Sequence, residues 1–179
     1  MKQTIFKYGL TAGIIIITIP AISGLIMGYG KDTFAIGEVI GYATMIFSLM
    51  MIFLAVSNYQ NQNPNEHIGF TKIFIIGSGI SFIAGLMFGI YNVIYVLYID
   101  PDFMNNYYEY TIDNIKNSDI SAEAINQKIK AMESEKEMFM KPSVNFFLMF
   151  ITVFVIGLVV SAISGLFQKD KNTQESKPA

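Results

Sequence analysis

The charged residues of this chain are bunched, and they leave four long intervals that carry no charge. The intervals are residues 8–30, 39–65, 73–99 and 142–168, and they contain 23, 27, 27 and 27 residues. Each interval holds a dense apolar run. A helix needs about 20 apolar residues to cross about 30 Å of hydrocarbon. All four intervals are therefore long enough to cross a membrane.

The composition favours membrane insertion over a soluble fold. The chain is 53% hydrophobic and only 15% charged, whereas soluble domains are about 25% charged. In lipid the backbone must satisfy its own hydrogen bonds, so an open segment forms a helix. The alternation of apolar and polar residues that marks a membrane barrel is absent. We predict an all-α fold, an integral membrane four-helix bundle in one domain over 1–179, with transmembrane helices at about 8–29, 37–58, 71–99 and 143–167.

The first apolar segment has a second interpretation. Lys2 and Lys7 precede it and the small-residue stretch Pro20–Gly24 follows, which is typical of a secretory signal peptide with a cleavage site. The apolar run nevertheless continues through Leu25–Met27, so the segment is long enough to span. We expect a retained first helix, and cleavage is the alternative.

Residues 100–141 form the one sizeable polar stretch, with nine carboxylates and five Lys. Pro101 interrupts the third helix because proline restricts the residue before it. Asn117–Asp119 is typical of a turn, and Ser121 can cap a helix that follows. The sequence therefore predicts an extramembrane helical hairpin at 101–141, between the third and fourth transmembrane helices.

The second helix of this hairpin carries an apolar stripe formed by Ile125, Ile129, Met132 and Phe139. The stripe has two interpretations. It packs within the hairpin, which is then a solvated cap, or it is a docking surface for a partner helix.

The positions of the Lys residues predict the orientation. Six Lys fall on each side of the membrane for an even number of crossings, and those near helix ends have the greater weight. Lys2, Lys7 and Lys72 lie close to the spans, as do two Lys of the tail at 169–179. We therefore predict that both termini are cytoplasmic and that 100–141 faces outward. The polar tail is predicted to be disordered.

Small residues recur at every fourth position in the third and fourth spans. They are Gly77, Ser81, Gly85 and Gly89 in the third span, and Gly157, Ser161 and Gly165 in the fourth. Such rows let helices in lipid approach closely. We predict an antiparallel pair with Gly77 near Gly165, Ser81 near Ser161 and Gly85 near Gly157. The rows pack within one chain or, alternatively, form a homodimer face or a sliding gate.

Asn92 is the intramembrane polar group of greatest interest. A buried amide needs hydrogen-bond partners. Asn92 therefore either bonds to a neighbouring helix or lines a polar pocket. Tyr91, Tyr95 and Tyr98 form a stripe beside it that is typical of a membrane interface.

The sequence carries no pattern for catalysis, for a cofactor or for a metal. It has no Cys, a single His, and no charged residue inside the four intervals, whereas transporters generally hold such groups in their spans. No phosphate-binding loop or nucleophile motif occurs. His67 is the only His, and a lone His beside Glu66 does not make a metal site. We predict a protein that is not an enzyme, with no catalytic, cofactor-binding or metal-binding residue and no nucleic-acid partner. Its expected partners are the lipid bilayer and either a second copy or another membrane protein.

Several short stretches occur in an order that resembles a known family. They are Phe6–Gly9, Ile68–Phe74, Tyr98–Met104, Met138–Pro142 and Gly157–Ser164. Over nearly its whole length the chain is similar to a domain-of-unknown-function family of small four-helix bacterial membrane proteins, found mainly in the Bacteroidota. The resemblance implies an integral inner-membrane protein with a retained first helix. It implies no catalytic residue, ligand or partner.

Two functional hypotheses follow. The first is a non-enzymatic membrane protein that acts through helix packing or through partner association by the outer hairpin. The alternative is a small oligomeric permease or channel subunit, in which Asn92, Ser78, Ser81 and Ser161 line a polar path. The environment of Asn92 separates them, because a water-filled cavity there favours the permease and a dry bundle favours association.

Overall fold

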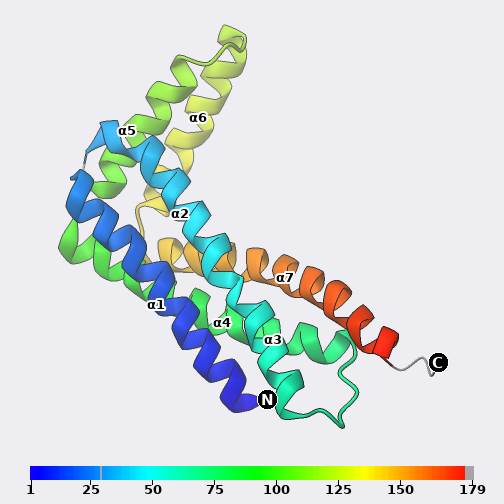
Figure 1. Cartoon of the computed structure of the whole chain (residues 1–179). Coiled ribbons are helices and arrows are strands. Elements are labelled where there is room, and N and C mark those ends of the chain that lie inside the picture. Colours follow the sequence, from blue (N-terminus) through cyan, green and yellow to red (C-terminus); the bar gives the residue numbers. More distant parts are fainter. Residues whose placement is uncertain (29, 176–179) are drawn as a thin grey trace.

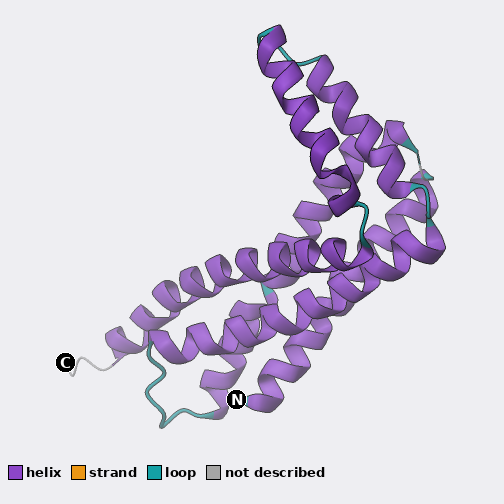
Figure 2. Cartoon of the chain, turned by 180° about the vertical axis from the view of Figure 1, so that it is seen from behind, coloured by secondary structure: helices purple, strands orange, loops and turns teal. Residues whose placement is uncertain are grey.

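The computed structural model describes residues 1–28 and 30–175, with side chains to residue 168. Within this described part the regular structure is entirely helical (Figure 2). In chain order the elements are α1 (Lys2–Met27), η1 (Lys31–Thr33), α2 (Phe34–Leu49), α3 (Met51–Gln62), α4 (Phe70–Ile94), η2 (Tyr95–Ile99), α5 (Phe103–Lys116), α6 (Ala122–Phe139) and α7 (Pro142–Glu175). The all-α prediction is confirmed.

Four helical segments are long and apolar enough to cross a membrane. They are Lys2–Met27, Lys31–Gln62, Phe70–Ile99 and Pro142–Gln168. The second segment joins η1, α2 and α3, with a one-residue turn at Met50 between the last two. The third ends in the π-helical turn η2, after which Pro101 prevents the helix from continuing.

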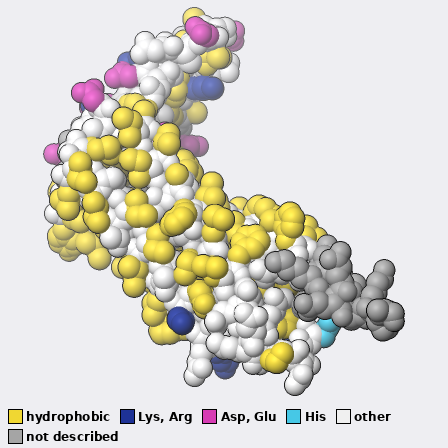
Figure 3. Space-filling model, in the orientation of Figure 1, with side chains coloured by type: hydrophobic (Ala, Val, Ile, Leu, Met, Phe, Trp, Pro, Cys, Tyr) yellow, Lys and Arg dark blue, Asp and Glu magenta, His cyan; other side chains and the backbone are white. Residues whose placement is uncertain are grey.

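The surface of the bundle is apolar, whereas charged side chains gather on the hairpin (Figure 3). Five such side chains, spread over the first, second and fourth spans, are 57–62% exposed: Ile14, Phe47, Leu54, Phe147 and Leu166. Exposed apolar surface of this extent marks an interaction site on a soluble protein. On four helices of membrane-spanning length it is the surface that faces lipid.

Helix α4 is the centre of the bundle. It buries nine residues, mostly at three- and four-residue steps: Ile73, Ile76, Gly77, Ile80, Ser81, Ala84, Gly85, Phe88 and Gly89. Helix α1 packs on one side of it, where Gly9 lies against Ile83 and Ile5 lies against Gly79. Helix α7 packs on another side, and Leu49 and Ile52 of the second span are fully buried in the same core.

Helices α5 and α6 form the predicted hairpin, which projects from one end of the bundle (Figure 1). The start of α1 and the end of α7 lie at the opposite end (Figure 1). Ser121 caps α6, because its hydroxyl accepts a hydrogen bond from the Ala124 backbone N–H at 3.3 Å. With four helical segments along the bundle, the start of α1 and the end of α7 both lie away from the hairpin (Figure 1).

Helix α7 is longer than predicted. The sequence suggested a disordered tail at 169–179, but the helix continues to Glu175. The reason is local, because 168–175 contains neither Gly nor Pro to end a helix, and the next Pro is Pro178. The rest of the predicted tail, 176–179, lies outside the described residues.

Candidate functional site

The close contact between α4 and α7 is built from two Gly-x-x-x-Ser segments that run in opposite directions. Gly77 lies against Ser161, and Gly157 lies against Ser81. A Cβ atom added at either glycine would overlap the Cβ and Oγ atoms of the facing serine. Each serine therefore fits the space that a missing side chain leaves on the other helix. We call these four residues the Gly–Ser seam.

The serines of the seam satisfy their own hydroxyl groups. Ser81 donates to the carbonyl oxygen of Gly77 at 2.8 Å, and Ser161 donates to that of Gly157 at 2.6 Å. Both serines are 0% exposed. Each hydroxyl is thus satisfied by a carbonyl of its own helix, and it needs no hydrogen-bond partner on the other helix.

The predicted register of this pair is wrong by one step of four residues. We expected Gly77 near Gly165 and Ser81 near Ser161, but Gly77 meets Ser161 and Ser81 meets Gly157. Glycine opposite glycine would leave a gap, and serine opposite serine would crowd two side chains. The observed register pairs a small residue with a larger one at both positions, so the helices stay in contact along the seam.

The remaining small residues of the two rows face aromatic rings. Gly85 lies against Phe150 and Gly89 against Phe146, while Gly165 lies against Phe70 at the start of α4. A Cβ at Gly85 would come 3.0 Å from the Phe150 carbonyl oxygen. The prediction placed Gly85 and Gly165 opposite glycines and gave Gly89 no partner, but all three glycines face a ring.

A cavity of about 690 Å³ lies in the end of the bundle nearest the hairpin. Its walls come from the ends of α1 and α4, the starts of α2 and α7, and the inner sides of α5 and α6. We call it the hairpin cavity. Most of its lining is apolar, with rings such as Phe88, Tyr95 and Phe103 and several Met side chains.

Asn92 borders the hairpin cavity rather than a dry helix contact. Its Oδ1 atom is buried and accepts no hydrogen bond from any residue that the structure describes. Asn145 borders the same cavity, is 5% exposed, and places its Nδ2 atom 2.8 Å from Met104 Sδ. Asn92 therefore borders a pocket, but the wall of this pocket is mostly apolar and is not the polar one that the sequence suggested.

An aromatic cluster fixes the hairpin to the bundle. Phe34, the first residue of α2, is 9% exposed. Its ring centroid lies 5.6 Å from that of Phe103, 5.6 Å from that of Tyr107 and 5.3 Å from that of Tyr110. Phe103 also meets Tyr95 edge-on at 5.3 Å. Such ring pairs stabilise the contact by more than their buried area alone.

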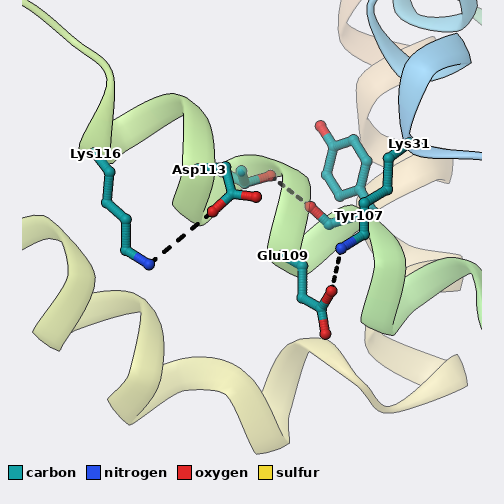
Figure 4. Close-up of polar contacts among 6 residues, drawn as sticks. Lys31, Tyr107, Glu109, Asp113 and Lys116 are labelled. Atoms are coloured by element: carbon teal, nitrogen blue, oxygen red, sulfur yellow. Dashed lines mark hydrogen bonds and ion pairs between the residues drawn. The ribbon is translucent and has the colours of Figure 1, made fainter.

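Two polar contacts accompany this cluster (Figure 4). The Tyr107 hydroxyl donates to Glu38 Oε1 at 2.8 Å, and Lys31 forms an ion pair with Glu109. Burial first, and then the hydrogen bond to Glu38, raises the pKa of Tyr107 well above its ordinary value. The hydrogen bond from Lys31 lowers the pKa of the Glu109 carboxyl. The second span and α5 are thus joined by both rings and charges.

Three carboxylates border the hairpin cavity, and they come from three different elements. Glu38 lies on α2, Asp100 follows η2, and Glu135 lies on α6. Among the described lining residues there is no Lys. The nearby cations are engaged elsewhere, since Lys31 pairs with Glu109 and the Lys136 ammonium lies 4.5 Å from the centroid of the Tyr108 ring.

The order of these parts is that of a known family, and a family model matches residues 7–170. The matched range includes nearly all of the four apolar segments and the whole hairpin. The chain belongs to the DUF4199 family. Its description is "Protein of unknown function (DUF4199)". The resemblance noted in the sequence is therefore confirmed, and no curated protein and no solved structure matches the chain.

The sequence analysis singled out Asn92, which borders the cavity, but it did not identify the rest of the cavity wall. Glu38 and Tyr107 are 69 residues apart, and nothing in the spacing of either predicts the bond between them. The sequence held one indication of this contact. Phe34 and Glu38 lie at the outer start of the second span, at the same side as the 100–141 loop. Among the described side chains there is no cluster of three or more His, Asp or Glu that could hold a metal ion.

Proposed function

We propose that this DUF4199 protein is a non-enzymatic multi-pass protein of a bacterial plasma membrane that acts by association through its outer hairpin. The observation that carries the proposal is that neither α5 nor α6 contains a fully buried residue. An amphipathic helix usually buries its apolar side. In α6 the stripe residues Ile125, Ile129, Met132 and Phe139 are only half-buried. The partner is another membrane protein or a second copy of the chain.

The proposed orientation has both termini in the cytoplasm and 100–141 in the periplasm. Two features support it. The start of α1 and the end of α7 lie opposite the hairpin (Figure 1). Lys2, Lys7 and Lys72 lie close to the ends of spans, where Lys marks the cytoplasmic side. A cysteine at Ser118 should react with a membrane-impermeant maleimide added to spheroplasts. A cysteine at Asn65, in the loop before α4, should react only after lysis.

The association is tested by crosslinking from single cysteines, which the absence of native Cys makes simple. Ile129→Cys places the crosslinker on the stripe, and Lys130→Cys places it at the next position on an exposed part of the same helix. In native membranes we expect an adduct of defined mass from Ile129→Cys and none from Lys130→Cys. Two differently tagged copies then show whether the adduct is a homodimer. Equal reaction from both positions, or none from either, would contradict the proposal.

The hairpin cavity favours a second candidate, a small oligomeric permease or channel subunit. Asn92 borders the cavity and has a buried oxygen without a described partner. The cavity does not continue through the bundle, since Leu49, Ile52, Ile76, Ile80 and Val153 are all 0% exposed. A single chain in this conformation therefore offers no through path. Solute flux from vesicles that contain the protein, no faster than from empty vesicles, would remove this candidate.

A further inference from the structure

The hairpin cavity combines a large apolar volume with charge of one sign. We propose that it binds a lipophilic organic cation, a molecule with an apolar body and a delocalised or ammonium positive charge. This inference goes beyond the proposed function and does not depend on it, because the cavity is complete within one chain.

The first support is the set of aromatic rings in the wall. Five of the rings come from three elements and belong to Tyr91, Tyr95, Phe103, Tyr107 and Tyr108. The face of an aromatic ring attracts a cation, and the attraction grows when water is excluded. Tyr108 differs from the other four rings, because the Lys136 ammonium lies 4.5 Å from its ring centroid and already interacts with it. The cavity therefore offers apolar contact and cation–π contact to the same ligand.

The second support is charge complementarity. Glu38, Asp100 and Glu135 border the cavity, and no described Lys does. Their negative field attracts a cation and opposes an anion. It also opposes the phosphate of a phospholipid headgroup, so an ordinary bilayer lipid is a poorer occupant than a cation without a phosphate group.

The third support is Asn92. Its Oδ1 atom is buried at the cavity wall and accepts no hydrogen bond from the described residues. A bare amide oxygen is the negative end of a dipole, and leaving it without a partner is costly. The field of this dipole attracts a cation in the cavity and repels an anion.

The probes are tetraphenylphosphonium and tetraphenylborate, which have nearly the same size and shape and opposite charge. The full chain, purified in micelles of an uncharged detergent, is titrated with each ion separately by calorimetry, and the heat from empty micelles is subtracted. We expect saturable binding of one tetraphenylphosphonium per chain and at least tenfold weaker binding of tetraphenylborate. Equal or tighter binding of tetraphenylborate, or no saturable binding of tetraphenylphosphonium, would overturn the proposal.

Two sets of variants locate the site. The double variant Glu38→Gln with Asp100→Asn removes two wall charges, and we expect it to bind tetraphenylphosphonium at least tenfold more weakly. The matched control Asp119→Asn with Glu123→Gln removes two carboxylates near the far turn of the hairpin, outside the cavity wall, and should bind as the unchanged chain does. An equal loss of tetraphenylphosphonium binding in both double variants would indicate a general effect of charge and would contradict the assignment of the site to the cavity.

A third variant fills the cavity without removing charge. Gly41 borders the cavity, and a Cβ atom added there meets nothing within 4 Å. Gly41→Phe should therefore keep the helical circular dichroism and melting temperature of the unchanged chain while binding of tetraphenylphosphonium is lost. Retained binding with a retained fold would place the ion elsewhere on the protein and contradict the assignment. Two stripe residues, Met132 and Phe139, also border the cavity, but Ile129, which carries the crosslinker, does not. Failure of the crosslinking test therefore leaves this result standing.

Discussion

The two ends of the bundle are held together in different ways. Toward the chain termini, α4 and α7 meet through the Gly–Ser seam, where Gly77 and Gly157 each receive a serine and both hydroxyls are satisfied within their own helices. Toward the hairpin, Phe34 and the rings around it bridge wider gaps, and a cavity of about 690 Å³ lies beside them. Small residues let the helices approach closely at the seam, and aromatic rings span the wider separation near the hairpin.

The difference follows from the solvent at each end. Lipid tails are as apolar as side chains, so helices in the membrane gain little from burying apolar area and instead gain from close backbone approach. The hairpin extends beyond the spans, where water makes the burial of rings favourable. The seam therefore excludes ligands, while the aromatic end can hold one.

The largest expected effect is at the aromatic end. Phe34→Ala removes the ring that meets Phe103, Tyr107 and Tyr110, and loss of a buried Phe costs about 3 kcal/mol. We expect the backbone amides of α5 to exchange hydrogen about a hundredfold faster, since about 1.4 kcal/mol is a factor of ten. Peptides from the seam should be unchanged. Hydrogen–deuterium exchange with mass spectrometry measures both regions at once.

The control for this variant is Phe47→Ala on the same helix, because Phe47 is 62% exposed to the lipid side. It should leave exchange in α5 as it is. Faster exchange throughout the bundle in Phe34→Ala would show that the two ends are one cooperative unit, and the contrast between them would then be wrong.

The second prediction concerns the seam. Gly77→Leu forces a side chain into the position of Ser161, and overpacking of this kind costs about 1–3 kcal/mol. We expect a lower melting temperature in detergent, measured by circular dichroism. Gly37→Leu is the matched control, since a Cβ there meets nothing within 4 Å.

The register of the seam can be tested separately by exchanging the glycine and the serine of one facing pair. In the double variant Gly77→Ser with Ser161→Gly, the serine is moved to the other helix and faces glycine as before. We expect this variant to recover most of the stability that Gly77→Ser alone loses. No recovery would mean that Gly77 and Ser161 are not neighbours, and the register predicted from sequence would regain support.

The spans could be predicted from sequence because insertion is a property of one segment. The charge-free intervals set the length of each helix, and Pro101 and Pro142 set the ends of the hairpin. The family could be recognised for a similar reason, because the order of the segments along the chain can be read directly from the sequence. The start of α1 at Lys2 and the extension of α7 to Glu175 were missed because polar residues can continue a helix beyond the membrane.

The contacts between segments were harder to predict. Spacing of four residues identified the small rows, but it cannot choose between registers that differ by four residues. The choice depends on which side chain fits which gap, as Ser161 fits Gly77. The hairpin cavity depends on how six helices come together at one end, and no local pattern around Glu38 or Tyr107 predicts that.

A third prediction, of smaller effect, concerns the bond between Tyr107 and Glu38. Tyr107→Phe keeps the ring and removes the hydroxyl, so we expect a loss of about 1 kcal/mol. The folded protein holds the tyrosine proton more tightly than the unfolded chain, whose pKa is about 10.0. The contribution of Tyr107 to the free energy of unfolding is therefore fully present below pH 10 and declines as the pH rises above it.

Absorbance at alkaline pH measures this titration directly. The unchanged chain should contain a tyrosine that ionises well above the ordinary range, and Tyr107→Phe should lack this late step. An identical titration curve for both proteins, corrected for one fewer tyrosine, would show that Tyr107 is not held by Glu38 in the folded state.

The smallest expected effect is in the loop at the other end of the bundle. Glu66 accepts a hydrogen bond from Tyr59 at 3.0 Å and forms an ion pair with Lys72, and the bond from Lys72 lowers the pKa of Glu66 below its ordinary 4.5. A lowered pKa means that the contribution is present above pH 4.5 and is lost as the pH falls through the folded value. Because this pair is open to solvent, Glu66→Gln should shift the melting temperature less than either seam variant does. The shift should vanish in acid, and a shift equal at pH 7 and pH 3 would assign it to the loop backbone and not to the charge.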